Sequence, residues 1–465
     1  MTRYDLVVIG SGPAGHHAAI QGAKLGKSVL IVEAQPRVGG AGLTTGTVPS
    51  KALRELAVRT RRSPGQPFED WTAAAQGVMA RCRDIVAREV AVYEAQFARN
   101  GVHVVHGWAE LTGPRTLRIA APGGGRAIEA GVIVIATGTK PARHPGFEID
   151  GRCVVDTDGV LELPAAPRSL IIVGAGIVGV EYACTFAALG ARVTVVDVRE
   201  RLMPFVDHEI AEALGYQMRE AGITLRLGEE VSSVHMTDGP TPAATAVLRS
   251  RKQLRAEVLL YAVGRFGNTE ALNLAAAGLE ADARGRVQVG DDGETATPGI
   301  YAVGDVAGFP GLASVAMEQG RRAVCHAFSR TVGASRRLFP YGIYTIPEIS
   351  FVGPTERELT EAGVPYEVGM AYYREIARGQ IRGDHAGRLK LLFHREDGRL
   401  LGVHVIGEGA AELVHIGQAV MSFGGTIEYF VENVFNYPTL AECYKVAALC
   451  AMGRMGAWEG GPALV

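Results

Sequence analysis

Two glycine-rich turns of identical spacing are the part of this 465-residue sequence best suited to chemistry. Both have the form G-x-G-x-x-G. Their glycines are Gly10, Gly12 and Gly15 and, 164 positions later, Gly174, Gly176 and Gly179. In this spacing the first glycine permits a tight turn, the second lets a diphosphate approach the backbone, and the third lets a helix pack closely on a strand. Both turns are therefore predicted to bind a dinucleotide.

An acidic residue stands at the same place in each repeat, Glu33 in the first and Asp197 in the second. A carboxylate at this place can accept hydrogen bonds from a ribose. Asp197 favours the 2′-hydroxyl of NAD(H) and repels the 2′-phosphate of NADP(H). Arg199 and Arg201 follow closely and could pair with that phosphate, or they could belong to an ordinary surface turn.

Strand–turn–helix–strand units must hold these motifs. The apolar run 6–9 is typical of a buried parallel strand, and the helix after the first motif is expected to end near Gly26. Residues 170–197 repeat the whole unit without a gap. Because a repeated unit is more specific than either motif alone, the sequence predicts an α/β chain with two Rossmann-like dinucleotide-binding domains.

Composition is that of an ordinary soluble globular chain, with 47% hydrophobic and 21% charged residues. The net charge of −2 gives no reason to expect nucleic acid or a membrane surface as a partner. No apolar run approaches the roughly 20 residues of a membrane span. Because the first strand starts so close to Met1, no signal peptide is expected and the predicted location is the cytoplasm. The six scattered cysteines are expected to be reduced, and no metal site is predicted.

Four segments together resemble one protein family, the flavin-dependent pyridine nucleotide-disulfide oxidoreductases. They are residues 10–15, 39–51, 136–138 and 297–305. The resemblance covers essentially the whole chain and implies FAD in the first dinucleotide site and NAD(P) in the second. It also implies a homodimer or higher homo-oligomer. The implied domains are the first part of an FAD-binding domain at 1–150, an NAD(P)-binding domain at 151–270, the second part of the FAD-binding domain at 271–338, and a C-terminal α+β dimerisation domain at 339–465.

The groups that reduce disulfides in this family are missing here. In the family motif G-G-x-C-x-x-x-x-C-x-P-S-K, the two cysteine positions hold Gly42 and Thr47. Neither can form a thiolate, so disulfide reduction by this motif is excluded. In the H-P-x-x-x-E element, which supplies a His–Glu base to the other subunit's active site, Tyr437 replaces the histidine and Glu442 remains. A phenol is a poor base at neutral pH.

The two residues that lie beside the flavin in this family are present in this sequence. Lys51 and Glu181 match a Lys–Glu pair that lies beside the flavin N5 atom in the family. A cation there stabilises negative charge on the flavin. Either residue alone could be an ordinary surface charge, but the joint match favours the flavin role. The resemblance implies further cofactor contacts at Gly40, Gly42, Thr47, Thr137, Gly138, Gly264, Asp305 and Ala313.

Within the family, three segments most resemble the members that pass a hydride between NADH and NADPH through FAD. They are residues 47–54, 342–350 and 435–442. The expected activity is therefore FAD-dependent NAD(P)⁺ transhydrogenation of the Si-specific type, by a ping-pong mechanism without a redox disulfide. Those members typically have a cysteine at the position of Gly42. Two alternatives stay open, an NAD(P)H:quinone or dye oxidoreductase (diaphorase) and a non-catalytic flavoprotein that acts as a redox-sensing or interaction subunit.

Overall fold

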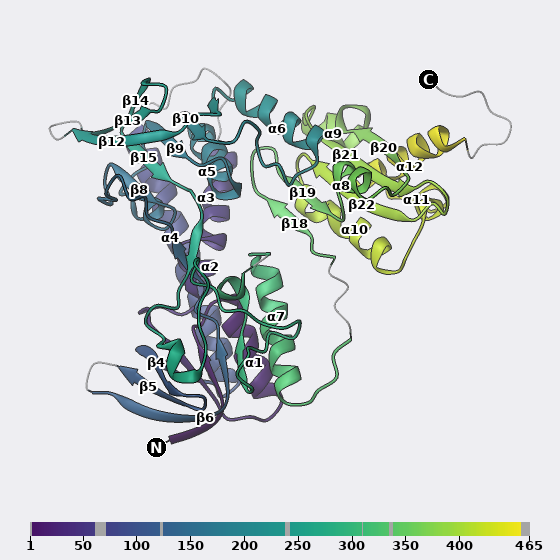
Figure 1. Cartoon of the computed structure of the whole chain (residues 1–465). Coiled ribbons are helices and arrows are strands. Elements are labelled where there is room, and N and C mark those ends of the chain that lie inside the picture. The colour runs from purple at the N-terminus through teal and green to yellow at the C-terminus, as the bar shows by residue number, and fades with distance from the viewer. Residues whose placement is uncertain are drawn as a thin grey trace. The chain divides into compact units, whose positions relative to one another are not determined.

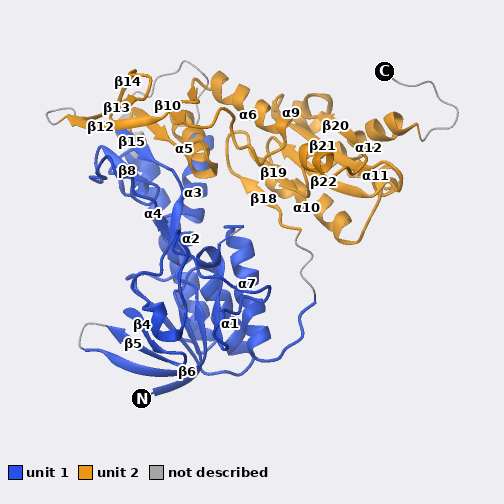
Figure 2. Cartoon of the chain, viewed as in Figure 1, with its two compact units in different colours: residues 1–166, 258–334 blue, residues 167–257, 335–465 orange. Residues whose placement is uncertain are grey.

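The chain folds into two compact units, each assembled from separate segments (Figures 1 and 2). Unit 1 contains Met1–Ala166 and Val258–Ala334, and unit 2 contains Pro167–Glu257 and Ser335–Val465. The structure is a computed structural model. It describes residues 2–60, 71–120, 124–237, 242–308, 310–333 and 338–456, with the backbone alone at 71–75.

A seven-stranded sheet forms the centre of unit 1, in the order β3-β2-β1-β6-β5-β4, with β17 paired to β6. Its parallel strands are β1 (Thr2–Ile9), β2 (Val29–Glu33), β3 (His103–His106), β6 (Arg126–Ile135) and β17 (Ile300–Ala302). The antiparallel strands are β4 (Trp108–Gly113) and β5 (Thr116–Ala120).

The burial of strand β1 on both faces explains why the residues just before the first glycine motif are all apolar. Leu6 and Val8 join one buried cluster, and Val7 and Ile9 join another. Successive side chains of a strand point to opposite faces, so a strand covered on both faces must be apolar at every position. The first of these clusters also contains residues of α1 (Pro13–Lys24), α4 (Trp71–Arg99) and α7 (Ala313–Ala327).

Shorter elements complete unit 1. Helix α2 (Gly40–Thr44) leads into α3 (Thr47–Thr60), which packs on α4. The paired strands are β7 (Thr139–Pro141) with β16 (Arg265–Gly267), antiparallel, and β8 (Val154–Asp156) with β15 (Val258–Tyr261), parallel. The 3₁₀ turns are η1 (Gly159–Glu162), η2 (Leu274–Ala277) and η3 (Gly304–Ala307).

The second glycine unit lies in unit 2 with the topology of the first. Its parallel strands are β9 (Ser169–Val173), β10 (Arg192–Asp197) and β11 (Thr224–Leu227). The helices of this segment are α5 (Ile177–Ala188) and α6 (His208–Glu220). An antiparallel sheet follows, built from β12 (Val231–Thr237), β13 (Ala243–Leu248) and β14 (Gln253–Ala256).

The C-terminal part of unit 2 is an antiparallel sheet in the order β18-β19-β22-β21-β20. Its strands are β18 (Tyr341–Ile343), β19 (Ile349–Val352), β20 (Tyr366–Tyr372), β21 (Arg388–His394) and β22 (Leu400–Ile406). The helical elements are α8 (Glu356–Glu361), η4 (Tyr373–Glu375), α9 (Ala377–Arg382), α10 (Ala410–Ser422), α11 (Ile427–Glu432) and α12 (Glu442–Met455). Helices α10 and α12 share one apolar core with the sheet.

Two properties predicted from composition can be compared with the structure. All six cysteines are reduced thiols, and five of them are buried. Among the described residues, no helix combines the length and apolar character needed to cross a membrane.

Candidate functional site

The first glycine turn joins β1 to α1 and has no room for a side chain at Gly10 or Gly15. Gly10 has φ +101°, and a Cβ there would lie 2.5 Å from the carbonyl oxygen of Ala136. A Cβ at Gly15 would lie 2.0 Å from the carbonyl oxygen of Gly10. Gly12 is the N-cap of α1, and no side chain caps that helix. Because the first N–H groups of a helix have no partner within it, this turn is suited to an anion.

The second glycine turn repeats that geometry between β9 and α5. Gly174 has φ +108°, and a Cβ at Gly179 would lie 1.9 Å from the carbonyl oxygen of Gly174. Gly176 is the N-cap of α5 and again has no side-chain cap. The correspondence between the two motifs in the sequence is therefore a correspondence of backbone conformation.

Glu33 is buried at the end of β2 and holds the first turn in shape. Its Oε2 accepts hydrogen bonds from the backbone N–H of Ser11 at 2.9 Å and from Ser11 Oγ at 2.5 Å. Its Oε1 accepts from the backbone N–H of Gln35 at 2.8 Å. Ser11 Oγ accepts in turn from the N–H of Gly39 at 2.9 Å. Glu33 thus organises two loops, and its predicted contact with a ribose stays a prediction.

The segment after Glu33 returns to the first turn. A Cβ at Gly40 would lie 2.8 Å from Gly12 Cα, and one at Gly42 would lie 2.7 Å from Pro13 Cγ. Thr47 begins α3, and Lys51 lies one turn later in the same helix. Gly40 and Gly42 therefore lie beside the glycine turn.

The ends of β6 and β17 supply further groups in unit 1, and these strands are neighbours in the sheet. Thr137 follows β6, and its Oγ1 is buried with no hydrogen-bond partner among the described residues. Gly138 follows with φ +62°. Asp305 follows β17 and accepts a hydrogen bond from Thr139 Oγ1 at 3.4 Å, and burial raises the pKa of its carboxyl group. Ala313 begins α7, a helix without a side-chain cap.

These features fit a bound dinucleotide. Gly40 approaches Gly12 so closely that it has no room for a side chain, and helix α1 begins there without a side-chain cap. The buried hydroxyl of Thr137 lacks a protein partner among the described residues, and buried polar groups normally have one. The first glycine turn, Thr137, Asp305 and the start of α7 stay the residues predicted to hold FAD.

Asp197 is paired with Arg199 in the structure. Arg199 Nε donates to Asp197 Oδ1 at 2.8 Å and Nη2 donates to Oδ2 at 2.6 Å, while the backbone N–H of Ala175 donates to Oδ2 at 2.5 Å. Burial alone would raise the pKa of Asp197, but the hydrogen bonds from Arg199 and from Ala175 outweigh it and lower that pKa. The carboxylate is therefore ionised and paired with a guanidinium.

Lys51 lies in unit 1 and Glu181 in unit 2. Lys51 Nζ lies 3.3 Å from Ser50 Oγ in unit 1. Glu181 is buried on α5 in unit 2, where its Oε1 accepts from the backbone N–H of Tyr344 at 2.8 Å. Their predicted pairing beside the flavin stays a prediction.

The C-terminal element contributes one exposed and one buried group. Tyr437 is 68% exposed. Glu442 begins α12, and its Oε2 is buried with no hydrogen-bond partner among the described residues. The two residues of the predicted pair therefore differ strongly in their access to solvent.

Arg265 is a residue of this site that the glycine motifs did not reveal. It follows the predicted Gly264, which has φ +84°. Its guanidinium donates to Thr139 through Nε at 2.9 Å and to Asp158 Oδ1 through Nη1 at 2.9 Å. Because Thr139 donates to Asp305, Arg265 helps to orient the predicted flavin contact. The sequence feature that could have indicated Arg265 is its position directly after Gly264, the glycine that follows an apolar strand.

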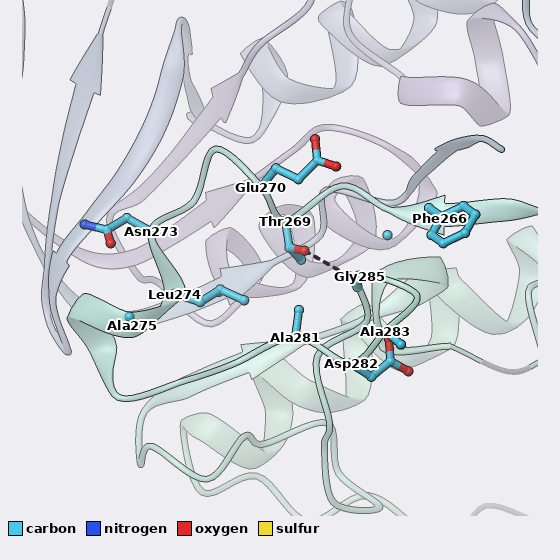
Figure 3. A pocket seen from close by; sticks show the side chains of 11 residues that line it. Phe266, Thr269, Glu270, Asn273, Leu274, Ala275, Ala281, Asp282, Ala283 and Gly285 are labelled. Carbon is cyan, nitrogen blue, oxygen red and sulfur yellow. Dashed lines mark hydrogen bonds between the residues drawn. The ribbon is translucent and has the colours of Figure 1, made fainter. Parts of the chain in front are cut away.

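A surface pocket of about 550 Å³ also lies in unit 1 (Figure 3). Its polar groups already have partners. Thr269 Oγ1 donates to the carbonyl oxygen of Gly285, Glu270 pairs with Lys140, and Asp282 accepts from backbone N–H groups. None of the predicted site residues lines it, so this pocket is separate from the candidate site. Its lining residues are Phe266, Gly267, Thr269, Glu270, Asn273, Leu274, Ala275, Ala281, Asp282, Ala283 and Gly285.

Comparison with known proteins identifies the family of the chain. Residues 4–320 match the family model for the pyridine nucleotide-disulphide oxidoreductases, and residues 339–448 match the dimerisation domain of that family. The chain therefore belongs to the pyridine nucleotide-disulphide oxidoreductase family. The α/β fold class predicted from the sequence, with a C-terminal dimerisation domain, is confirmed.

Two relatives within the family are similar to this chain over nearly its whole length. The soluble pyridine nucleotide transhydrogenase of Mycobacterium tuberculosis is 48% identical and aligns over 98% of this chain and 99% of its own length. That of Colwellia psychrerythraea is 44% identical over 97% of this chain and 98% of its own length. The predicted resemblance to these proteins is confirmed.

Solved structures share the fold. The HOCl-induced flavoprotein disulfide reductase RclA from Escherichia coli, as its Cu(II) complex, has a TM-score of 0.88 at 26% identity, covering 97% of this chain and 99% of its own. LpdA from Mycobacterium tuberculosis has a TM-score of 0.88 at 28% identity, with the same coverage of both chains.

Proposed function

We propose that this protein catalyses FAD-dependent hydride transfer between NADH and NADP⁺, and between NADPH and NAD⁺, as a transhydrogenase of the Si-specific type. The observation that carries the proposal is the pairing of Asp197 with Arg199 in the second glycine unit. A transhydrogenase must accept both coenzymes at one site. The relatives named soluble pyridine nucleotide transhydrogenase support the same activity.

The Asp197–Arg199 pair offers one group to each coenzyme. A ribose 2′-hydroxyl can donate to the carboxylate, as in NAD-binding sites. A 2′-phosphate can accept from the guanidinium, which binds phosphate in a fixed, bidentate geometry. The side chain of Asp197 is 4% exposed and that of Arg199 is 41% exposed, so the cation is the more accessible group. Asp197 therefore does not present an unpaired negative charge to NADP(H).

Redox chemistry would come from bound FAD, which can take a hydride from one nicotinamide nucleotide and give it to the next in a ping-pong sequence. The chain's own residues bind and orient. The first glycine turn receives a diphosphate, Arg265 and Thr139 orient the Asp305 carboxyl group, and the Lys51 ammonium supplies positive charge in the same unit. Gly42 and Thr47 at the redox cysteine positions support a mechanism without a disulfide.

The assembly and the domain limits belong to the same proposal. The match to a dimerisation domain supports a homodimer built through residues 339–465. The FAD-binding domain would comprise 1–150 and 271–338, and the NAD(P)-binding domain 151–270. NADH and NADPH are the proposed substrates, and the proposed location is the cytoplasm.

An anaerobic titration tests the activity. The FAD-loaded protein is reduced with one equivalent of NADH, NADP⁺ is added, and the flavin band near 450 nm (about where oxidised flavins absorb) is followed. Recovery of the band together with formation of NADPH is the expected result. A band that stays bleached until a quinone is added would replace the proposal with the NAD(P)H:quinone oxidoreductase. A protein that NADH fails to reduce at all would be a non-catalytic flavoprotein.

A further inference from the structure

A fully buried lysine lies on an inner strand of the C-terminal sheet. The side chain of Lys390, on β21, is 0% exposed. Its Nζ lies 3.0 Å and 3.1 Å from the two carboxylate oxygens of Asp207 and 2.6 Å from Glu209 Oε2, and it also contacts Glu356 Oε1. A buried ammonium group is stable only with such partners. The three carboxylates are near enough to one another for a metal ion, but Lys390 already contacts all of them.

Asp207 uses its carboxylate in an unusual way. It is the N-cap of α6, yet its side chain makes no hydrogen bond to the first N–H groups of that helix. An aspartate at an N-cap normally accepts such a bond. Here the carboxylate is 2% exposed and contacts Lys390 instead. The start of α6 is therefore attached to the C-terminal sheet within unit 2 (Figure 2).

The segment between Asp197 and Asp207 connects the coenzyme-binding pair to this lysine. At its first end, Asp197 is held by Ala175 and Arg199, and the carbonyl oxygen of Arg199 accepts from the N–H of Gly228 at 3.0 Å. At its second end, Asp207 is held by Lys390. Residues 198–207 therefore connect Arg199 directly along the chain to the contact with Lys390.

The interior of the segment is packed as well. Met203 is fully buried with φ +38°, a conformation that is strained for a residue with a side chain. Leu202 and Val206 are buried, and the ring of Phe205 lies 6.4 Å from that of Phe351 on β19. Strained backbone persists only where its surroundings hold it. The support of this segment therefore includes the C-terminal sheet.

We propose that Lys390 is a positioning residue for coenzyme binding, which acts through Asp207 to fix the segment 198–207 and so to place Arg199 for the 2′-phosphate of NADP(H). The proposal rests on the proposed function, because it assumes that Arg199 meets that phosphate. It assigns to the dimerisation region a part in choosing between the two coenzymes.

Two matched substitutions test it by equilibrium binding. Asp207→Asn and Glu356→Gln each remove one carboxylate charge from Lys390, but only Asp207 belongs to the segment that carries Arg199. Dissociation constants of NAD⁺ and NADP⁺ are measured by calorimetry on the FAD-loaded protein. Asp207→Asn should weaken NADP⁺ binding by about fivefold relative to NAD⁺, a typical coupling for residues that do not touch the ligand. Glu356→Gln should leave the ratio unchanged.

Any other result would contradict either the role of Lys390 or the proposed function. An equal effect of both substitutions on the ratio, or none with Asp207→Asn, would overturn the role of Lys390. If Asp207→Asn does not fold, Phe205→Ala decides the question, because Phe205 is 39% exposed and its loss loosens the same segment without changing charge. An unchanged ratio there would also overturn the role. A wild-type protein that binds no NADP⁺ would instead contradict the proposed function.

Discussion

The guanidinium of Arg199 and the carboxylate of Asp197 form a bidentate pair, with Nη2–Oδ2 and Nε–Oδ1 distances of 2.6 Å and 2.8 Å. The pair stands at the end of β10, where a lone carboxylate would select NAD(H). In the pair, the charge of this carboxylate is compensated by a guanidinium, a group whose geometry also suits phosphate. The sequence contains both residues, but only their geometry explains how one site could serve both coenzymes.

Replacing Arg199 should weaken the binding of NADP⁺ more than the binding of NAD⁺. Arg199→Met is expected to weaken NADP⁺ binding by about tenfold, or about 1.4 kcal/mol, because the 2′-phosphate then meets an unpaired Asp197. NAD⁺ binding should change little. Calorimetric titration with each nucleotide measures the difference, and Arg201→Met serves as the control for loss of a nearby positive charge. Equal weakening of both nucleotides would show that Arg199 only supports the loop.

Replacing Asp197 should have the opposite effect and weaken the preference for NADH over NADPH. Asp197→Ala removes the acceptor for a ribose 2′-hydroxyl and leaves Arg199 available to phosphate. The ratio of kcat/KM for NADH to that for NADPH should therefore fall. Asp197→Asn is the matched control, since its amide oxygen can still accept from the N–H of Ala175. An unaltered ratio in both variants would refute the role of Asp197 in coenzyme choice.

Lys51→Ala should slow the reduction of bound flavin by NADH without releasing FAD. Loss of a group that stabilises developing negative charge costs about 10²-fold in rate. Anaerobic stopped-flow absorbance measures the rate, and the ratio of flavin to protein absorbance measures FAD content. Lys51→Arg keeps the charge and should recover part of the rate. Reduction at the wild-type rate in Lys51→Ala would mean that this lysine is an ordinary helix residue.

Tyr437→Phe should be mild. The side chain is 68% exposed, and exposed substitutions usually change energies by less than about 0.5 kcal/mol. Steady-state transhydrogenation assays should therefore give kcat and KM close to those of the wild type. A loss of several orders of magnitude would assign the phenol a chemical task.

We expect the folded protein to lose stability in acid because of the buried His16. It is buried on α1, where its ring stacks on Tyr93 at 4.0 Å, and burial, followed by the charge of His17, lowers its pKa to about 4. The unfolded chain, with an ordinary histidine pKa near 6.5, binds this proton more readily. The stability that neutral His16 contributes is therefore complete above pH 6.5 and is lost as the pH falls toward 4.

Denaturant unfolding at pH 7 and pH 4.5 measures this loss. His16→Phe removes the titrating group and keeps an aromatic ring against Tyr93. The wild type should lose about 2 kcal/mol more than His16→Phe between the two pH values. An identical loss in both proteins would mean that other groups account for the acid sensitivity.

The parts of the structure that follow local rules were predictable. Glycine spacing dictates the conformation of both turns, and the apolar runs around them required strands covered on two faces. Side-chain pairing across the fold was not predictable. Lys390 stands in the strand sequence R-L-K-L-L-F-H, where a charged residue is typical of a solvent-facing position. Its partner Asp207 lies 183 positions away, so only the tertiary structure makes it a buried ion pair.

The order of the segments in unit 1 has a consequence for biosynthesis. Strand β17 pairs with β6 although it begins 165 positions after β6 ends, and α7 packs on α1 although it begins 289 positions after α1 ends. Asp305 and the start of α7 leave the ribosome long after the first glycine turn has done so. The nascent chain must therefore keep an incomplete sheet protected while the whole second glycine unit is translated. A chain that ends before Ile300 lacks β17 and Asp305 and should not retain FAD.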